Sequence, residues 1–175
     1  MTKAIALGLM TAFIGTKTVL ATPMNREDYD NYRGLPVTPL VESDGYLVEY
    51  TDGGKSNHPN HKGFISWSPK SVFENAYRQN GALTFGDAIY ALKQGKKVTR
   101  SGWDGGNQYV VAQAQTTSTD ASKIWNPHNK AHAEKLGGSI DVAPYCTLKT
   151  AQDTLAMGWT PDTSDLFAED WVILE

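Results

Sequence analysis

An arginine and a tryptophan on either side of a glycine bend are the residues best suited to hold a ligand. Arg100 and Trp103 flank the dipeptide Ser101-Gly102. A guanidinium binds phosphate through charge-assisted hydrogen bonds, and an exposed indole can stack on a nucleobase. Glycine has no side chain, so a ligand can approach the backbone closely at that point. The pattern predicts a nucleotide site, and packing of Trp103 in the core is the alternative that stays open.

The histidines form the only pattern in the sequence that resembles a metal site. His58 and His61 lie close together in the sequence, and His128 and His132 have the i, i+4 spacing of metal ligands on a helix. A zincin-like site needs a glutamate directly after the first histidine, where this chain has Asn129. Solvated surface histidines are therefore the favoured interpretation. We expect neither a metal nor a cofactor.

Signatures of enzymatic chemistry are weak in this sequence. It contains no Gly-x-Ser-x-Gly motif and no phosphate-binding loop. The single cysteine, Cys146, lies in an expected strand, where a buried thiol is inert. Four carboxylates near the C-terminus could pair for acid–base catalysis, but they fit helix caps and turns equally well: Asp162, Asp165, Glu169 and Asp170. We therefore expect a protein that is not an enzyme.

Composition excludes several classes of protein. The 175 residues carry a net charge of −3, and 40% of them are hydrophobic, which is too apolar for a disordered chain. The charge argues against binding a nucleic-acid polymer, which needs a basic surface. One cysteine cannot form an intramolecular disulfide. A short apolar run after Lys3 is similar to a signal peptide, with a buried first element as the alternative, and is too short to span a membrane.

The chain is expected to contain two modules, residues 1–80 and 81–175, joined at a polar segment. In the first module, Asn25 is a helix N-cap and Gly34 ends that helix. Ser68 is expected to cap a second helix that has Pro69 at its first position. Short apolar or alternating runs predict strands at residues 19–21, 45–50 and 64–67.

The second module shows a comparable mixture of elements. Thr84 and Asp87 form a capping-box-like pair before a helix that Gly95 ends, and Pro127 starts a short helix. Residues 115–120 are expected to form a polar loop and residues 164–168 a helical turn. Strands are expected at residues 97–100, 109–112, 145–150 and 171–174. The fold class is therefore α+β, with each module a short antiparallel sheet packed with one or two helices.

Four segments of the second module, in this order, resemble one phage family. They are residues 83–88 (LTFGDA), 95–103 (GKKVTRSGW), 148–151 (LKTA) and 165–171 (DLFAEDW). Together they are similar to the second Thoeris anti-defence family over residues 83–175. The resemblance implies a homotetramer that binds cyclic ADP-ribose-type signals between subunits without degrading them, and some members also hold cyclic dinucleotides.

The resemblance extends the predicted site beyond the glycine bend. It assigns Lys149 and Thr150 as phosphate partners, Trp159 as an aromatic wall and Asp165 as the acceptor for a ribose hydroxyl. One difference from the family is the segment 161–165, which reads PDTSD. Its added carboxylate, Asp162, would repel a phosphate.

The first module resembles an uncharacterised phage domain that has no known activity. The matching segments are residues 21–24, 29–34, 45–50, 52–55 and 65–69. Because this pattern begins near Gly15, we expect the protein in the host cytoplasm rather than secreted, with no membrane partner. Two alternative functions stay open. One is a phage hydrolase of the same signals that uses His128, His132 or the Asp162/Asp165 pair, and the other is a structural phage accessory protein without a small ligand.

Overall fold

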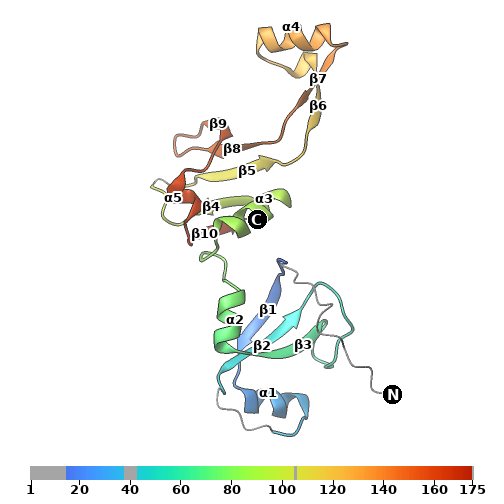
Figure 1. Ribbon diagram of the computed structural model, residues 1–175, viewed down its shortest axis with the longest axis vertical. Coiled ribbons are helices and arrows are strands. Elements are labelled where there is room, and N and C mark those ends of the chain that lie inside the picture. The colour runs from blue at the N-terminus through green and yellow to red at the C-terminus, as the bar shows by residue number, and fades with distance from the viewer. Residues whose placement is uncertain (1–14, 38–42, 105, 175) are drawn as a thin grey trace, which may run out of the picture. The chain divides into compact units, whose positions relative to one another are not determined.

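The chain forms two compact units, residues 1–77 and 78–175, each built from a short antiparallel sheet and helices (Figure 1). The computed structural model describes residues 15–37, 43–104 and 106–174. The apolar run after Lys3 lies outside these residues. Within the described ranges, no helix has the length and apolar character needed to cross a membrane. The α+β fold class is confirmed.

The first unit is a three-stranded antiparallel sheet in which one helix connects the first two strands and another follows the third. Strands β1 (Val19–Pro23), β2 (Gly45–Tyr50) and β3 (Phe64–Pro69) pair in that order. The helices are α1 (Arg26–Arg33) and α2 (Lys70–Ala76). Asn25 caps α1 and Gly34 ends it in a left-handed conformation, as the sequence predicts. Tyr29 from α1 packs with Leu47 and Ile65 of the sheet, and these three side chains form the core.

One expectation for this unit is wrong. Ser68 does not cap a helix, because its backbone pairs with Tyr46 in the β2–β3 ladder. The residue before α2 is Pro69, which makes no side-chain cap hydrogen bond. The sheet partner therefore extends β3 by two residues into the segment where local sequence predicts the start of a helix.

The second unit is centred on a five-stranded antiparallel sheet. Its strand order is β10-β4-β5-β8-β9. The bounds are β4 (Lys97–Arg100), β5 (Tyr109–Gln113), β8 (Tyr145–Lys149), β9 (Leu155–Trp159) and β10 (Trp171–Leu174). Helix α3 (Phe85–Lys93) begins at the predicted Thr84–Asp87 capping box. It packs Ala88, Ala91 and Leu92 against the sheet residues Val98, Val110 and Trp171 to form the core.

A hairpin arm extends the adjacent strands β5 and β8 of this sheet (Figure 1). Strands β6 (Thr117–Asp120) and β7 (Ser139–Val142) pair with each other. They enclose a short 3₁₀ helix, η2 (Ala121–Lys123), and α4 (Pro127–Lys135). The prediction of a polar loop at residues 115–120 is therefore wrong. Its four polar residues form a strand because β7 supplies the hydrogen-bonding partner, and the helix predicted to start at Pro127 is confirmed.

Candidate functional site

Arg100, the last residue of β4, lies between two carboxylates. Its Nε donates to Asp170 Oδ1 at 2.8 Å, and its Nη1 donates to Asp165 Oδ1 at 2.9 Å. Asp170 directly precedes β10, whose Trp171 pairs with Arg100 across the sheet. The contact with Asp170 and then that with Asp165 raise the pKa of the Arg100 guanidinium. The Arg100 guanidinium in turn lowers the pKa of Asp170.

Asp165 receives hydrogen bonds on both carboxylate oxygens. Asp165 lies in α5 (Thr163–Leu166), a single helical turn that starts at a capping box formed by Asp162 and Asp165. Asp165 Oδ2 accepts the Asp162 backbone N–H at 3.2 Å, and Asp165 Oδ1 also accepts Trp103 Nε1 at 3.1 Å. Asp165 is buried, with 6% exposure. The added carboxylate of Asp162 therefore serves as a helix cap that holds Asp165 in position.

The glycine bend fits closely around Asp170. The Gly102 N–H donates to Asp170 Oδ2 at 2.7 Å, and the Ser101 N–H donates to the Asp170 carbonyl at 3.1 Å. A Cβ atom at position 102 would lie 2.7 Å from the same Oδ2, which is too close for a real contact. A side chain at position 102 would therefore collide with the Asp170 carboxylate, so the contact between Gly102 and Asp170 requires glycine.

Three tryptophans meet beside this ion-paired cluster. Trp171 is 1% exposed and donates its Nε1–H to the Asp165 carbonyl at 3.1 Å. The half-buried Trp103 makes edge-to-face contacts with Trp171, at 5.6 Å between ring centroids, and with Trp159, at 6.1 Å. Trp103 thus contacts the core on one side, while Asp165 fixes the orientation of its indole.

A pocket of about 280 Å³ opens next to Trp103 and Trp159. Its other lining residues are Asp104, Gln108, Leu148, Asp162, Ser164 and Asp165. Among the described residues that line it, three are carboxylates and none is a cation. The pocket therefore offers aromatic walls and hydrogen-bond acceptors, and its electrostatics alone would repel an anion.

Lys149 and Thr150 lie away from this pocket. Lys149 follows the pocket residue Leu148 in β8, so strand alternation directs the two side chains to opposite faces of the sheet. The Lys149 ammonium forms an ion pair with Asp153, whose side chain is 84% exposed. The Thr150 hydroxyl hydrogen-bonds the Thr154 hydroxyl at 2.7 Å in the turn between β8 and β9. The predicted site residues that the structure brings together are Arg100, Ser101, Gly102, Trp103, Trp159 and Asp165.

The structure adds residues that the sequence pattern did not assign to the site. Asp170 is central because it binds both Arg100 and the Gly102 N–H. The sequence carries a signal for it, since the Arg-Ser-Gly-Trp and Ala-Glu-Asp-Trp segments occur together, but a carboxylate before a strand is equally typical of a cap or turn. Gln108 and Leu148 line the pocket and carry no sequence signal for such a role.

The other candidates for chemistry are distributed as follows. His128 and His132 lie on α4, whereas His58 and His61 belong to the first unit. Over the residues that the structure describes, no group of three or more histidine, cysteine or acidic side chains could hold a metal ion. Cys146 is half-buried in β8, and burial raises the pKa of its thiol.

Comparison with known proteins identifies the second unit. The family model described as the Thoeris anti-defense 2-like domain matches residues 83–174. The protein named Thoeris anti-defense 2 from Bacillus phage SP01 is 34% identical over 92 residues, which cover 53% of this chain and 94% of that relative. The match contains the cluster of Arg100, Asp165 and Asp170 as well as the pocket-lining tryptophans. The chain therefore belongs to the Thoeris anti-defense 2-like family of phage anti-defence proteins.

Proposed function

We propose that this protein binds and sequesters a cyclic ADP-ribose-type immune signal in the host cytoplasm and does not degrade it. The observation that carries the proposal is the pocket bounded by Trp103 and Trp159 in the unit that matches the family. Its indoles offer faces and edges on which a nucleobase can stack. The carboxylate oxygens of Asp104 and Asp162 can accept ribose hydroxyl groups. Cyclic dinucleotides are a second class of ligand, and the mass spectrometry of released nucleotides described below detects them as well.

The phosphates of such a ligand need positive charge that the pocket lacks. Arg100 is the nearest cation to Asp165, and it is already bound to Asp165 and Asp170. A second copy of the chain can supply the missing charge, which favours a pocket shared between subunits. Exposed apolar side chains next to the pocket support this arrangement, because Leu166 and Phe167 at the end of α5 are 45% and 82% exposed. Leu155 and Met157 on the edge strand β9 are also exposed.

We expect a homotetramer, with a dimer as the smallest assembly consistent with the proposal. Light scattering at micromolar concentration should give a multiple of the chain mass of 19.2 kDa. Phe167→Asp should shift the mass towards the monomer, because it places a charge in the apolar contact. Val72→Asp, at a position of the first unit that is 58% exposed, should leave the mass unchanged. A monomer that still binds the nucleotide would contradict the shared pocket.

The fate of the ligand separates sequestration from hydrolysis. The protein is purified from cells that produce the signal and denatured by heat, and the released nucleotides are identified by mass spectrometry. Sequestration predicts intact cyclic nucleotide in stoichiometric amounts. A hydrolase that uses His128, His132 or the Asp162/Asp165 pair would release a linear product instead, and a structural accessory protein would release no nucleotide.

Trp103→Ala tests the pocket directly. Loss of one stacking partner should weaken nucleotide binding by about 1–3 kcal/mol, or about 5- to 150-fold, in calorimetric titrations. Trp125→Ala is the matched control, since Trp125 is 84% exposed and precedes α4. Both variants are first checked by thermal unfolding, because Trp103 also contacts Trp171. A folded Trp103→Ala protein with full affinity would refute the assignment of this pocket.

A further inference from the structure

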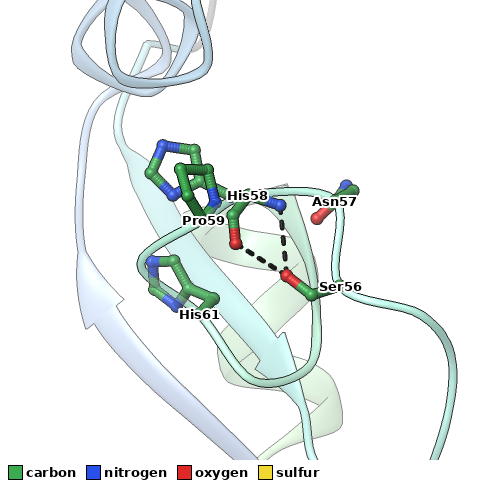
Figure 2. A pocket seen from close by; sticks show the side chains of 5 residues that line it. All are labelled: Ser56, Asn57, His58, Pro59 and His61. Carbon is green, nitrogen blue, oxygen red and sulfur yellow. Dashed lines mark hydrogen bonds between the residues drawn. The ribbon is translucent and has the colours of Figure 1, made fainter.

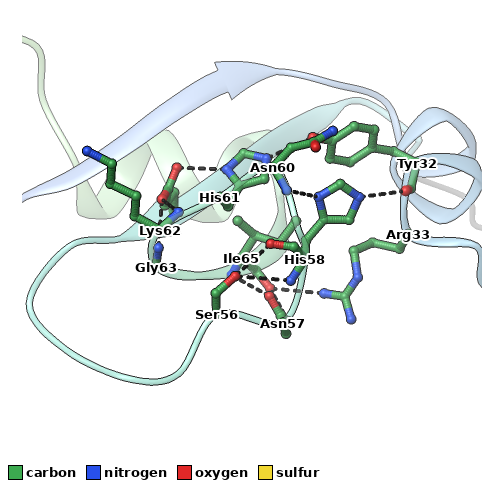
Figure 3. Close-up of polar contacts among 11 residues, drawn as sticks. Tyr32, Arg33, Ser56, Asn57, His58, Asn60, His61, Lys62, Gly63 and Ile65 are labelled. Atoms are coloured by element: carbon green, nitrogen blue, oxygen red, sulfur yellow. Dashed lines mark hydrogen bonds and ion pairs between the residues drawn. The ribbon is translucent and has the colours of Figure 1, made fainter.

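A carboxylate, an imidazole and a phenol form a continuous series of contacts in the first unit, whereas the proposed nucleotide site belongs to the second. Glu49 of β2 binds His61 Nδ1 through Oε2 at 2.7 Å, and His61 Nε2 lies 3.0 Å from the Tyr32 hydroxyl of α1. Figure 3 shows the Tyr32 ring extending from α1 towards the loop that carries His58 and His61. The order of groups is that of an oriented base next to a hydroxyl nucleophile.

The hydrogen-bond partners of Glu49 define where the protons lie along the Glu49–His61–Tyr32 series of contacts. Glu49 Oε1 accepts the Lys62 and Gly63 backbone N–H groups at 2.9 and 2.8 Å. The contact with His61, followed by that with Gly63, lowers the pKa of Glu49, so this carboxylate is ionised and can only accept. His61 Nδ1 must therefore carry the proton that it donates to Glu49. In the neutral imidazole, Nε2 is then the acceptor for the Tyr32 hydroxyl.

His58 holds the Tyr32 ring in place. The two rings are stacked with their centroids 4.2 Å apart, and His58 Nε2 lies 3.2 Å from the Tyr32 carbonyl. His58 Nδ1 accepts the Asn60 N–H at 3.3 Å, so Nε2 is the nitrogen that donates to the carbonyl. Tyr32 is nevertheless 36% exposed. The ring is therefore held by His58 and the hydroxyl contacts His61, while the residue stays exposed enough to meet a solute.

An open hollow of about 520 Å³ lies beside the Glu49–His61–Tyr32 series of contacts (Figure 2). It is lined by Ser56, Asn57, His58, Pro59 and His61, so the base that contacts Tyr32 also borders the hollow. The Ser56 and Asn57 side chains bind within the loop and to β3, which keeps the wall in shape. A small molecule in the hollow would therefore lie against His61.

We propose that Tyr32 is a base-activated nucleophile that accepts an acyl group from a small, uncharged, activated acyl donor. Tyr32 Oη forms a bond to the acyl carbon, and the bond from that carbon to the leaving group breaks. The phenolic proton passes to His61 Nε2 and from there to the leaving group. Glu49 is a positioning residue, because it orients the imidazole and stabilises the imidazolium that forms.

The charges around Tyr32 select an uncharged donor. The Glu49 carboxylate lies directly behind His61 and repels anions. The nearby guanidinium of Arg33 donates to Tyr29 Oη and to the Ile65 carbonyl, and Figure 3 places it on the side of Ile65 and Asn57. Phosphoryl donors would therefore meet negative charge near the nucleophile.

The experiment compares two tyrosines within the same intact protein. The full chain is treated with N-acetylimidazole, and acetylation rates are followed by peptide mass spectrometry. Tyr90 is the internal control, because it is 45% exposed and lies on α3 in the other unit. Tyr29 and Tyr32 share the tryptic peptide 27–33, and fragment spectra distinguish them.

Tyr32 should react at least about 10-fold faster than Tyr90, since a positioned general base typically contributes about 10²-fold or more. His61→Gln, which keeps a hydrogen-bonding group without the base, should reduce the Tyr32 rate to that of Tyr90. Glu49→Gln should give an intermediate rate.

Circular dichroism establishes that each variant is folded. If His61→Gln does not fold, the wild-type ratio of Tyr32 to Tyr90 still decides. A wild-type ratio near one, or an unchanged ratio in folded His61→Gln, would overturn the proposal and leave the chain of contacts as a structural connection between α1 and the loop.

Discussion

Replacing Trp171 by alanine should destabilise the second unit by about 3–5 kcal/mol, the largest loss expected for a single substitution in this protein. The side chain is 1% exposed and packs against Phe85 and Trp103. Its Nε1–H binds the Asp165 carbonyl, which would lose this partner. Alanine therefore leaves both a cavity and an unsatisfied acceptor. Urea unfolding followed by circular dichroism measures the loss.

The matched control for Trp171 is another tryptophan. Trp125→Ala removes the same atoms from a side chain that is 84% exposed, and should change the free energy of unfolding by less than about 0.5 kcal/mol. Equal effects of the two substitutions would show that Trp171 does not hold the core together.

Arg100→Met should cost about 3 kcal/mol, because it leaves the Asp165 and Asp170 carboxylates without their cation. The exposure of Asp165 is only 6%, so water cannot fully replace the guanidinium. In a unit of this size each kcal/mol lowers Tm by about 4–8 °C. Differential scanning calorimetry of the full chain should therefore show a clear downward shift for the transition of the second unit.

Lys149→Met provides the comparison for Arg100. Lys149 also forms an ion pair, but its partner Asp153 is 84% exposed, and such pairs contribute about 0–1 kcal/mol. Adding Asp165→Asn to Arg100→Met should recover part of the lost stability, since one uncompensated charge is removed. If Arg100→Met were no more harmful than Lys149→Met, Arg100 would be free to serve a ligand without structural cost.

Local sequence predicted the elements whose ends are fixed by nearby residues. The Asn25 cap and left-handed Gly34 bound α1, and the Thr84–Asp87 pair starts α3, as expected. These signals act over a few residues, so the sequence contains all of the information. The predicted strand 97–100 matches β4 for a similar reason, because a turn and a bend enclose it.

The failures have a common cause in long-range pairing. The strand β6 consists of polar residues that become a strand only because β7 pairs with it. The strand β9 contains Gly158 and exposed residues such as Met157, and its pairing with β8 supplies what its own composition lacks. Propensity in strands depends on neighbours across the sheet, which a single sequence does not identify.

The candidate site could likewise be predicted from local sequence only in part. Residue types and spacing predicted Arg100 and Trp103 as site residues, and the structure places both beside Asp165. What the sequence could not predict is that the Arg100 guanidinium is bound by carboxylates 65 and 70 residues away along the chain. Lys149 and Thr150 make their contacts at the β8–β9 turn. Their role as phosphate partners remains a prediction.

The shared guanidinium also constrains how this protein can evolve. Arg100, Asp165 and Asp170 form one electrostatic unit, and Gly102 gives Asp170 the space that it needs. A mutation that removes one member leaves the others with an uncompensated charge, so most single steps away from this arrangement pass through a less stable protein. For the signal binding that we propose, a pocket position such as Leu148 can therefore vary more readily, because its uncharged apolar side chain takes part in no ion pair.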